Sequence, residues 1–328
     1  MANALLQQSL SPLLPYLTGD TYEVMVNRPG EVWVDSIHGL HCHKLESLTE
    51  SHNQTLLQLL ASTRFKTMSV KTPILKDAFV CPGTTDRWRV TGVMPPVTQC
   101  VAFNFRRLNV KPLSTQTLVD HHYFEKEKLP LEGEATSIGI NYKHTDDKSR
   151  LTKIVAAIKK KRNLVISGAT GSGKSQFLNW CITQIPSDQR IITIEDTQEL
   201  VINQPNHVNL YYPDDIEQSD CKVTPEVLLK LVLRMKPDRV ITGEVTGTEL
   251  VTMIEKTNTG HPGTMMTIHT NSTAQAKNRM RDILLKVYPN QKAADLDHWI
   301  SEVVDMIVQV KRQGNYFFID ELWEKEGA

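Results

Sequence analysis

Apolar and polar residues alternate in short segments over the first third of the chain, which is the pattern of antiparallel strands with one buried face. Residues 23–27 and 31–35 alternate in this way on either side of Arg28-Pro29-Gly30, and so predict a β-hairpin. Residues 52–64 place four leucines on one side of a helix. Further strands are predicted at residues 78–81, 88–94 and 101–105. Residues 1–112 are therefore expected to form an α+β domain in which a helix packs on an antiparallel sheet.

Continuous apolar runs replace this alternation in the second half of the chain, and they are typical of strands buried on both faces of a parallel sheet. They occur at residues 163–167, 190–194, 239–243 and 264–268. Helices are predicted at residues 149–161, 176–184 and 224–236, and after the capping box Ser272-Thr273-Ala274-Gln275. A closing hairpin is predicted from residues 303–309 and 316–323. We expect an α/β domain over residues 149–328, and a linker over residues 113–148, which are rich in charged and small polar residues.

The segment between the first apolar strand and its helix carries the clearest chemistry. Gly168-Ala169-Thr170-Gly171-Ser172-Gly173-Lys174-Ser175 fits the phosphate-binding pattern G-x-x-x-x-G-K-[ST] at every specified position. The glycines let successive N–H groups point inward, and the start of the helix, which continues with Gln176, adds its positive end. Lys174 would reach the β- and γ-phosphates, and the Ser175 hydroxyl would coordinate Mg²⁺. A chance glycine turn is the alternative, but the flanking strand and helix argue against it.

Polar side chains follow three of the apolar strands, at the edge where open α/β sheets bind their ligands. Glu195 and Glu199 are candidates to orient Mg²⁺ or a water, with helix capping as the alternative. Glu244 is expected to hold Mg²⁺ through water and to polarise the attacking water. His269 can donate to a phosphate oxygen, the alternative being a core histidine with satisfied hydrogen bonds, and His261 lies in a nearby turn-rich loop.

Composition narrows the possible partners of this site. The 37 basic and 37 acidic residues give zero formal net charge, and basic and aromatic residues are not interleaved, so direct nucleic-acid binding is not expected. Five cysteines without a C-x-x-C pair argue against a disulfide framework and a zinc ribbon.

Two arginines, Arg106 and Arg107, follow an apolar strand. They either lie on a solvent-exposed sheet edge or complete a phosphate site across a domain or subunit boundary.

The location of the protein is also constrained by its apolar pattern. No uninterrupted apolar run approaches the ~18 residues of a membrane span, and the amino terminus has no basic region before its apolar residues. We expect a cytoplasmic protein that contacts a membrane at most through a partner.

Taken together, these motifs resemble the hexameric traffic ATPases of type IV secretion and conjugative DNA transfer, which are relatives of the type II secretion and type IV pilus motors. The resemblance spans nearly the whole chain, and residues 27–33 are similar to the amino-terminal signature of the secretion branch. Four segments match in order: the glycine loop, Ile194-Glu195-Asp196, residues 234–239 through Gly243-Glu244, and residues 259–263 through Thr267-Ile268-His269.

The resemblance implies a RecA-like P-loop ATPase domain behind a smaller amino-terminal sheet domain, each forming a ring in a homohexamer. ATP with Mg²⁺ would bind between the two domains, with Lys174 and Ser175 on the phosphates and the metal. Glu244 would polarise the water with support from Glu195, and His269 would contact the γ-phosphate. Arg106 or Arg107 would reach the phosphates from the amino-terminal domain.

The implied function is an ATP-hydrolysing ring motor that energises type IV secretion, conjugative transfer and pilus assembly. The ring would bind inner-membrane components of the secretion channel from the cytoplasmic side. Two departures from the family stand out, because arginine is common where this chain has Lys236 and Thr246. Thr246 leaves open a nucleotide-gated docking platform with little hydrolysis. A type II secretion or pilus motor is a third possibility, and the lack of cysteine pairs favours the type IV branch.

Overall fold

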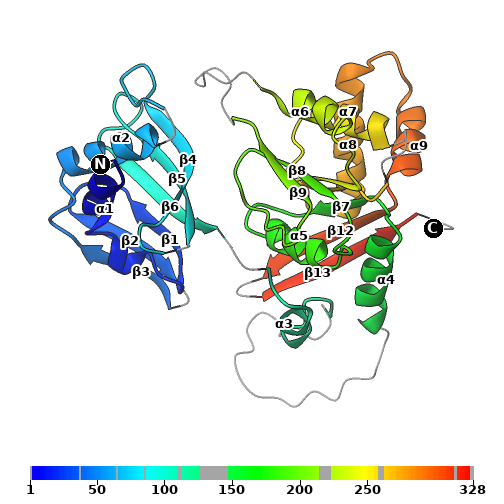
Figure 1. The fold of residues 1–328 in the computed structure, drawn as a ribbon, viewed down its shortest axis with the longest axis horizontal. Coiled ribbons are helices and arrows are strands. Elements are labelled where there is room, and N and C mark those ends of the chain that lie inside the picture. The colour runs from blue at the N-terminus through cyan, green and yellow to red at the C-terminus, as the bar shows by residue number, and fades with distance from the viewer. Residues whose placement is uncertain are drawn as a thin grey trace. The chain divides into compact units, whose positions relative to one another are not determined.

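The computed structural model describes residues 2–36, 38–63, 66–84, 86–108, 112–125, 147–213, 223–257, 262–313 and 316–325. The chain divides into two compact units. The first comprises residues 1–110 with 213–222, and the second comprises residues 111–212 with 223–328. In Figure 1 the first unit is mostly blue to cyan, and the second runs from green to red.

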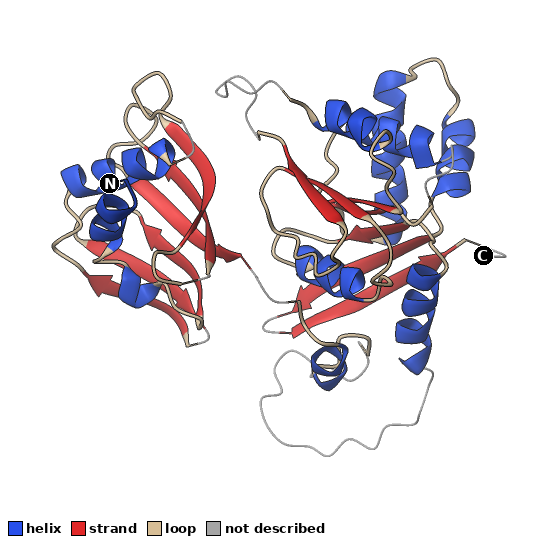
Figure 2. Cartoon of the chain, viewed as in Figure 1, coloured by secondary structure: helices blue, strands red, loops and turns tan. Residues whose placement is uncertain are grey.

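The first unit is built on an antiparallel sheet of order β3-β2-β1-β6-β5-β4 within the described residues. Helices α1 and α2 pack together against this sheet (Figures 1 and 2), and Leu10, Leu56 and Phe105 belong to their shared core. The element bounds are α1 (Ala2–Leu10), a 3-10 turn (Leu14–Tyr16), β1 (Thr21–Val26), β2 (Glu31–Ser36), β3 (Gly39–Lys44), α2 (Glu50–Ser62), β4 (Ile74–Val80), β5 (Arg87–Val93) and β6 (Ala102–Leu108).

The predicted hairpin, helix and three later strands of this unit are all confirmed. Val24 pairs with Val34 across the β1–β2 hairpin, and Thr49 caps α2 by accepting a hydrogen bond from the His52 amide at 3.2 Å. Strand β3 was not predicted, because all six of its residues are exposed and it therefore lacks the apolar alternation of a half-buried strand.

The second unit contains a sheet of order β13-β12-β7-β11-β10-β8-β9 within the described residues. Its strands are parallel except β13, which pairs antiparallel with β12. The strands are β7 (Leu164–Ser167), β8 (Ile191–Glu195), β9 (His207–Tyr211), β10 (Arg239–Thr242), β11 (Met265–Ile268), β12 (Met306–Gln313) and β13 (Tyr316–Glu324). The helices are α3 (Thr115–Asp120), α4 (Asp147–Lys159), α5 (Lys174–Thr183), α6 (Pro225–Val232), α7 (Glu249–Thr257), α8 (Thr273–Val287) and α9 (Ala293–Val303).

Both faces of this sheet are covered, which explains the continuous apolar runs of its strands. Successive residues point to opposite faces of a strand, and Met265 and Met266 accordingly belong to two different buried clusters. One cluster includes residues of α4 and α5, and the other includes residues of α6, α7, α8 and α9. The predicted α/β architecture is confirmed, including the closing hairpin and the capping of α8 by Ser272, whose hydroxyl accepts from the Gln275 amide at 3.1 Å.

The first part of the predicted linker contains a helix and packs against the second unit. Residues 115–120 form α3, and Trp180 of α5 donates a hydrogen bond to Thr115 at 3.1 Å. The Tyr123 ring stacks on Phe177 with centroids 5.4 Å apart, and Phe124 meets Trp180 at 5.4 Å. These two aromatic rings and Leu118 supply enough apolar surface to dock the segment on α5. Residues 126–146 of the predicted linker lie outside the described residues.

Candidate nucleotide site

The glycine loop occupies the turn between β7 and α5, at the carboxyl edge of the sheet. Gly171 and Gly173 have φ values of 74° and 88°, in the left-handed region that favours glycine. A Cβ atom on Gly173 would lie 2.9 Å from the Phe317 ring, and one on Gly168 would lie 2.7 Å from the Val310 carbonyl oxygen. The loop is thus packed so closely against β12 and β13 that these two positions require glycine.

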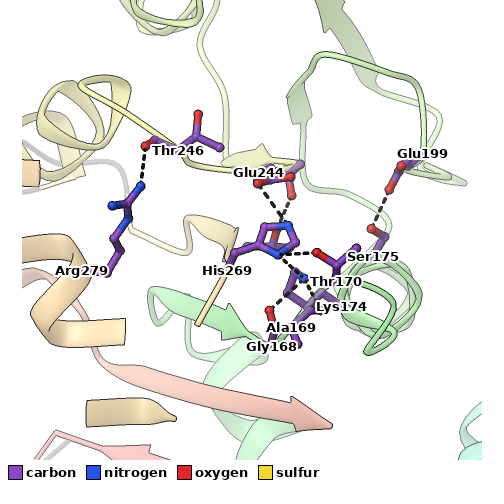
Figure 3. A network of polar contacts seen from close by, with 12 residues as sticks. Gly168, Ala169, Thr170, Lys174, Ser175, Glu199, Glu244, Thr246, His269 and Arg279 are labelled. Atoms are coloured by element: carbon purple, nitrogen blue, oxygen red, sulfur yellow. Dashed lines mark hydrogen bonds and ion pairs between the residues drawn. The ribbon is translucent and has the colours of Figure 1, made fainter. Parts of the chain in front are cut away.

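Lys174 begins α5 and turns its side chain back into the loop (Figure 3). Its ammonium donates to the carbonyl oxygens of Gly168 at 3.0 Å and Ala169 at 2.8 Å. Burial lowers the pKa of Lys174 to about 8, against the opposing influence of Glu244 and Glu199. The lysine is therefore a poorly solvated cation, and an anion on the loop would stabilise its charged form.

Glu195, the last residue of β8, and Glu199, four residues later, have distinct positions next to this loop. Ser175 donates its hydroxyl hydrogen to the Glu199 carboxylate at 2.6 Å. Glu195 accepts the amides of Glu199 and Leu200, each at 2.8 Å, on a single carboxylate oxygen. Burial raises the pKa of Glu195 to about 7, while these amide hydrogen bonds act in the opposite direction. Glu195 thus holds the turn that delivers Glu199 to Ser175.

His269 connects the lysine of the loop with the acid after β10. Its Nδ1 lies 3.3 Å from the Lys174 ammonium nitrogen and 3.5 Å from the Thr170 hydroxyl, and its Nε2 lies 3.1 Å from Glu244 Oε1 (Figure 3). An ammonium group can only donate hydrogen bonds. Nδ1 of His269 therefore accepts, and Nε2 carries the proton that faces Glu244. The predicted residues Lys174, Glu244 and His269 are thus brought together in one polar chain.

Two buried polar atoms of the loop region have no hydrogen-bond partner among the described residues. They are the Ser172 hydroxyl oxygen and the side-chain carbonyl oxygen of Gln176. Buried polar groups without partners are costly in a folded protein. The Ser172 hydroxyl, which can donate a hydrogen bond, the left-handed glycines of the loop and the buried lysine fit a polyanionic ligand. The Gln176 carbonyl oxygen can only accept a hydrogen bond, so it does not contribute to that fit.

The donor set next to the loop also fits Mg²⁺. Mg²⁺ takes oxygen ligands, keeps several waters and is usually held by one or two protein oxygens together with substrate phosphates. The Ser175 hydroxyl and the Glu199 and Glu244 carboxylates supply such oxygens. Within the described ranges no cluster of three or more histidine, cysteine or acidic side chains forms an all-protein metal site.

Arg106 and Arg107 lie on β6 and make their contacts within the first unit. Arg106 pairs with Glu23 at 3.1 Å. Arg107 pairs with Asp86 at 3.3 Å and donates to the Gly19 carbonyl oxygen. That one of these arginines completes the phosphate site stays a prediction.

The segment after Glu244 contains an arginine that the sequence pattern did not single out. Glu249 accepts the amides of Thr246 and Gly247 at 2.6 and 2.7 Å, and so fixes this turn before α7. Arg279 of α8 donates to the Thr246 carbonyl oxygen at 3.4 Å (Figure 3). The turn therefore has a guanidinium beside it, supplied by a residue distant in the chain, although position 246 itself is threonine.

Two further residues were named from the sequence: Lys236, where arginine is common in the family, and His261, in the turn-rich loop before β11. Lys236 is exposed and has a φ of 55°, just beyond the end of α6. His261 lies outside the described residues.

Among the described residues, no helix has the length and apolar character to cross a membrane.

A glycine loop with a buried lysine, acids after neighbouring parallel strands and this strand order define a RecA-like P-loop ATPase. Residues 102–313 match the family described as "Type II/IV secretion system protein", and the chain belongs to that family. It is 30% identical to the type IV secretion system protein VirB11 of Bartonella quintana, over 98% of this chain and 93% of the relative. It is 29% identical to VirB11 of Bartonella henselae, with the same coverage.

A solved structure supports the fold. The crystal structure of the pilus retraction motor PilT with bound ADP is similar, with a TM-score of 0.64 and 19% identity over 99% of this chain and 83% of that one. At this level of identity the likeness extends to the fold alone.

Proposed function

We propose that this chain hydrolyses ATP to energise type IV secretion, conjugative transfer and the associated pilus assembly. The observation that carries the proposal is the polar chain from Lys174 through His269 to Glu244 at the mouth of the glycine loop. It combines a cation for the phosphates with an acid for the attacking water. The near-full-length relatives named as type IV secretion proteins supply the process that hydrolysis would drive.

Each residue has a role that follows from its chemistry. Lys174 and the loop amides bind the β- and γ-phosphate oxygens. Glu244 orients the attacking water and accepts its proton, and the Nε2 proton of His269 is available to a γ-phosphate oxygen. Glu195 acts as a positioning residue, because it holds the turn that carries Glu199. Bound Mg²⁺, held by the Ser175 hydroxyl and through water by Glu244, with Glu199 as a further oxygen, would neutralise charge on the phosphates.

The assembly proposed for this enzyme is a homohexameric ring. Arg106 or Arg107 would then complete the phosphate site across a domain or subunit boundary, as an arginine finger does. The ring would dock on inner-membrane secretion-channel components from the cytoplasmic side, in peripheral contact with the membrane. Direct binding of nucleic acid is not part of the proposal, because the formal net charge is zero. A mass measurement with and without an ATP analogue tests the ring, and a chain that stays monomeric in both would contradict it.

Phosphate release by the purified full-length chain tests the enzymatic proposal. Lys174→Ala and Glu244→Gln should each reduce turnover at least about 100-fold, the scale on which lost transition-state stabilisation acts, and Glu244→Gln should still bind ATP. Lys230→Ala and Glu302→Gln, at exposed positions of α6 and α9, are the matched controls. Undiminished hydrolysis in either site variant would overturn the assignment.

The two other candidate functions make different predictions. A docking platform, favoured by Thr246, would release little phosphate even with a membrane or partner complex present. A motor has turnover that rises when its partner complex is added. The pilus-motor alternative rests on a likeness of fold to PilT, whereas the relatives that align over nearly the whole chain belong to type IV secretion, and so the secretion proposal is the better one.

A further inference from the structure

The order of strands around the glycine loop gives a bound nucleotide a direction. Glu244 and His269 follow β10 and β11, which lie on one side of β7, and β12 lies on the other side. The proposed function places the γ-phosphate next to Glu244 and His269. A triphosphate that starts there and crosses the loop past Lys174 extends away from β11, so its nucleoside end lies on the side of β12 and β13.

The β12–β13 hairpin reaches past the end of β7 and runs beside the loop. Gln309 pairs with Ser167, the last residue of β7, and the next residue, Val310, has its carbonyl oxygen 2.7 Å from where a Cβ atom on Gly168 would lie. The Phe317 ring is packed so close to Gly173 that a Cβ atom there would lie 2.9 Å from it. An aromatic ring of this hairpin therefore touches the last glycine of the phosphate loop.

Arg312 and Phe317 face each other across this hairpin in the strand register. The guanidinium carbon of Arg312 lies over the Phe317 ring, 5.2 Å from its centroid. Phe317 is half-buried and Arg312 is exposed. Aromatic rings and guanidinium planes are the side-chain surfaces on which nucleobases stack. The same contact would be seen if Arg312 and Phe317 only stabilised the hairpin. In that case their substitution would not weaken the binding of a nucleotide more than the binding of a ligand without a base.

We propose that Phe317 and Arg312 form the nucleoside subsite, with the base of the bound nucleotide stacked on this cation–π pair. The inference rests on the proposed function, because that function places the γ-phosphate at the opposite end of the loop. It assigns the hairpin a share in nucleotide affinity that the phosphate loop alone does not provide.

Calorimetric titration of the full-length chain with ADP and with inorganic pyrophosphate separates the two parts of the site, because both ligands carry two phosphates and one lacks a nucleoside. Phe317→Leu should weaken ADP binding by about 5- to 100-fold, the range for loss of a base–aromatic stack, and leave pyrophosphate binding unchanged. Phe317→Tyr should retain ADP affinity. Arg312→Ala should weaken ADP binding by about two- to fivefold, the scale of an exposed cation–π contact.

The neighbouring residues supply matched controls, because adjacent strand positions point to opposite faces. Tyr316→Leu and Lys311→Ala change an aromatic residue and a cation on the same hairpin, and neither should affect ADP binding. Lys311 pairs instead with Asp320, at 3.2 Å. Arg312→Ala also keeps the test decisive if Phe317→Leu does not fold, because Arg312 is exposed.

The possible outcomes distinguish failure of this subsite from failure of the proposed function. Weaker ADP binding with unchanged pyrophosphate binding supports the subsite. An unchanged ratio of ADP to pyrophosphate affinity in Phe317→Leu and Arg312→Ala overturns it, whether both affinities fall together or neither changes, and leaves the ATPase proposal standing. A wild-type chain that binds neither ligand overturns the ATPase proposal itself.

Discussion

Ser175 donates its hydroxyl hydrogen to the carboxylate of Glu199 at 2.6 Å, so the serine of the phosphate loop is already paired with an acid. That pair exists because Glu195 accepts the amides of Glu199 and Leu200 and thereby shapes the turn after β8. A buried acid and an acid at the loop thus have separate roles, one in positioning and one beside the proposed metal.

Removal of the Ser175 hydroxyl should change the metal requirement of the enzyme. In Ser175→Ala, one oxygen ligand of the proposed Mg²⁺ site is lost while the phosphate-binding amides and Lys174 remain. We expect the Mg²⁺ concentration for half-maximal phosphate release to rise about tenfold or more, the usual scale for a perturbed metal site. Pyrophosphate binding in EDTA should stay within twofold of wild type. Ser301→Ala, on α9, is the control, and an unaltered Mg²⁺ dependence would argue against the site.

Glu195→Gln should stabilise the protein above neutral pH. The pKa of Glu195 is raised from 4.5 to about 7, chiefly by burial. Because the folded state binds the extra proton between these two values, stability from this group is present below pH 4.5 and is lost as the pH rises to about 7. Glutamine is uncharged and can still accept the two amides. The gain at pH 8 has an upper bound of about 3 kcal/mol.

Denaturant unfolding at pH 5 and pH 8 tests this expectation. The variant and wild type should be close in stability at pH 5, and the variant should be more stable at pH 8. Glu302→Gln, exposed on α9, should show no such difference. A variant less stable than wild type at pH 8 would mean that the ionised carboxylate is required by the turn.

Nucleotide binding should take up protons near pH 8. Burial lowers the pKa of the Lys174 ammonium to about 8 in the free protein, and phosphate oxygens around it favour the charged form and raise that pKa. Affinity for ADP should therefore be full below pH 8 and fall as the pH rises through 8, approaching tenfold per pH unit where the free lysine is neutral.

Calorimetry in two buffers of different ionisation enthalpy measures this uptake directly. We expect proton uptake at pH 8.5 that is larger than at pH 6.5. The same experiment on Lys174→Met should give weak binding without uptake at either pH. Equal uptake at both values in the wild type would exclude Lys174 as the titrating group.

His269→Ala should lower turnover more than it lowers affinity. The variant removes the Nε2 proton that faces Glu244 and the acceptor for Lys174. Loss of one preformed donor to developing charge costs about 100-fold or more in kcat, whereas ground-state binding retains Lys174 and the loop amides. His298→Ala, exposed on α9, is the control. If the variant lost nucleotide affinity and turnover by the same factor, His269 would have a role in nucleotide binding alone.

The parallel strands were predictable because their burial on both faces leaves continuous apolar runs, and the glycine loop because its backbone geometry demands glycine at fixed spacing. Helix α9 could also have been found, since Leu296, Ile300 and Val303 recur at helical spacing and are buried. The contact between Arg279 and Thr246 was not predictable, because it joins α8 to the turn before α7 through tertiary packing.

The Ser175–Glu199 pair was similarly hidden in the sequence. Both Glu195, at the end of β8, and Glu199, in the turn after it, were candidates, and their spacing in the sequence does not show which one faces the loop. The structure shows which acid faces the loop. Glu195 accepts two backbone amides and points inward, and this leaves Glu199 to accept the hydrogen bond from Ser175. Strand β9 escaped prediction because it carries mostly half-buried and exposed residues at the sheet edge.

The two left-handed glycines of the loop should respond differently to a single added methyl group. Gly171→Ala and Gly173→Ala share the backbone cost of a positive φ, about 1–2 kcal/mol. A Cβ on Gly171 meets nothing within 4 Å, whereas one on Gly173 lies 2.9 Å from the Phe317 ring. We therefore expect Gly173→Ala to be the less stable variant by a further ~1–3 kcal/mol of overpacking. In Gly173→Ala combined with Phe317→Leu, part of that difference should be recovered, and denaturant unfolding of the three variants measures it. Equal stability of the two single variants would contradict the close packing of the hairpin on the loop.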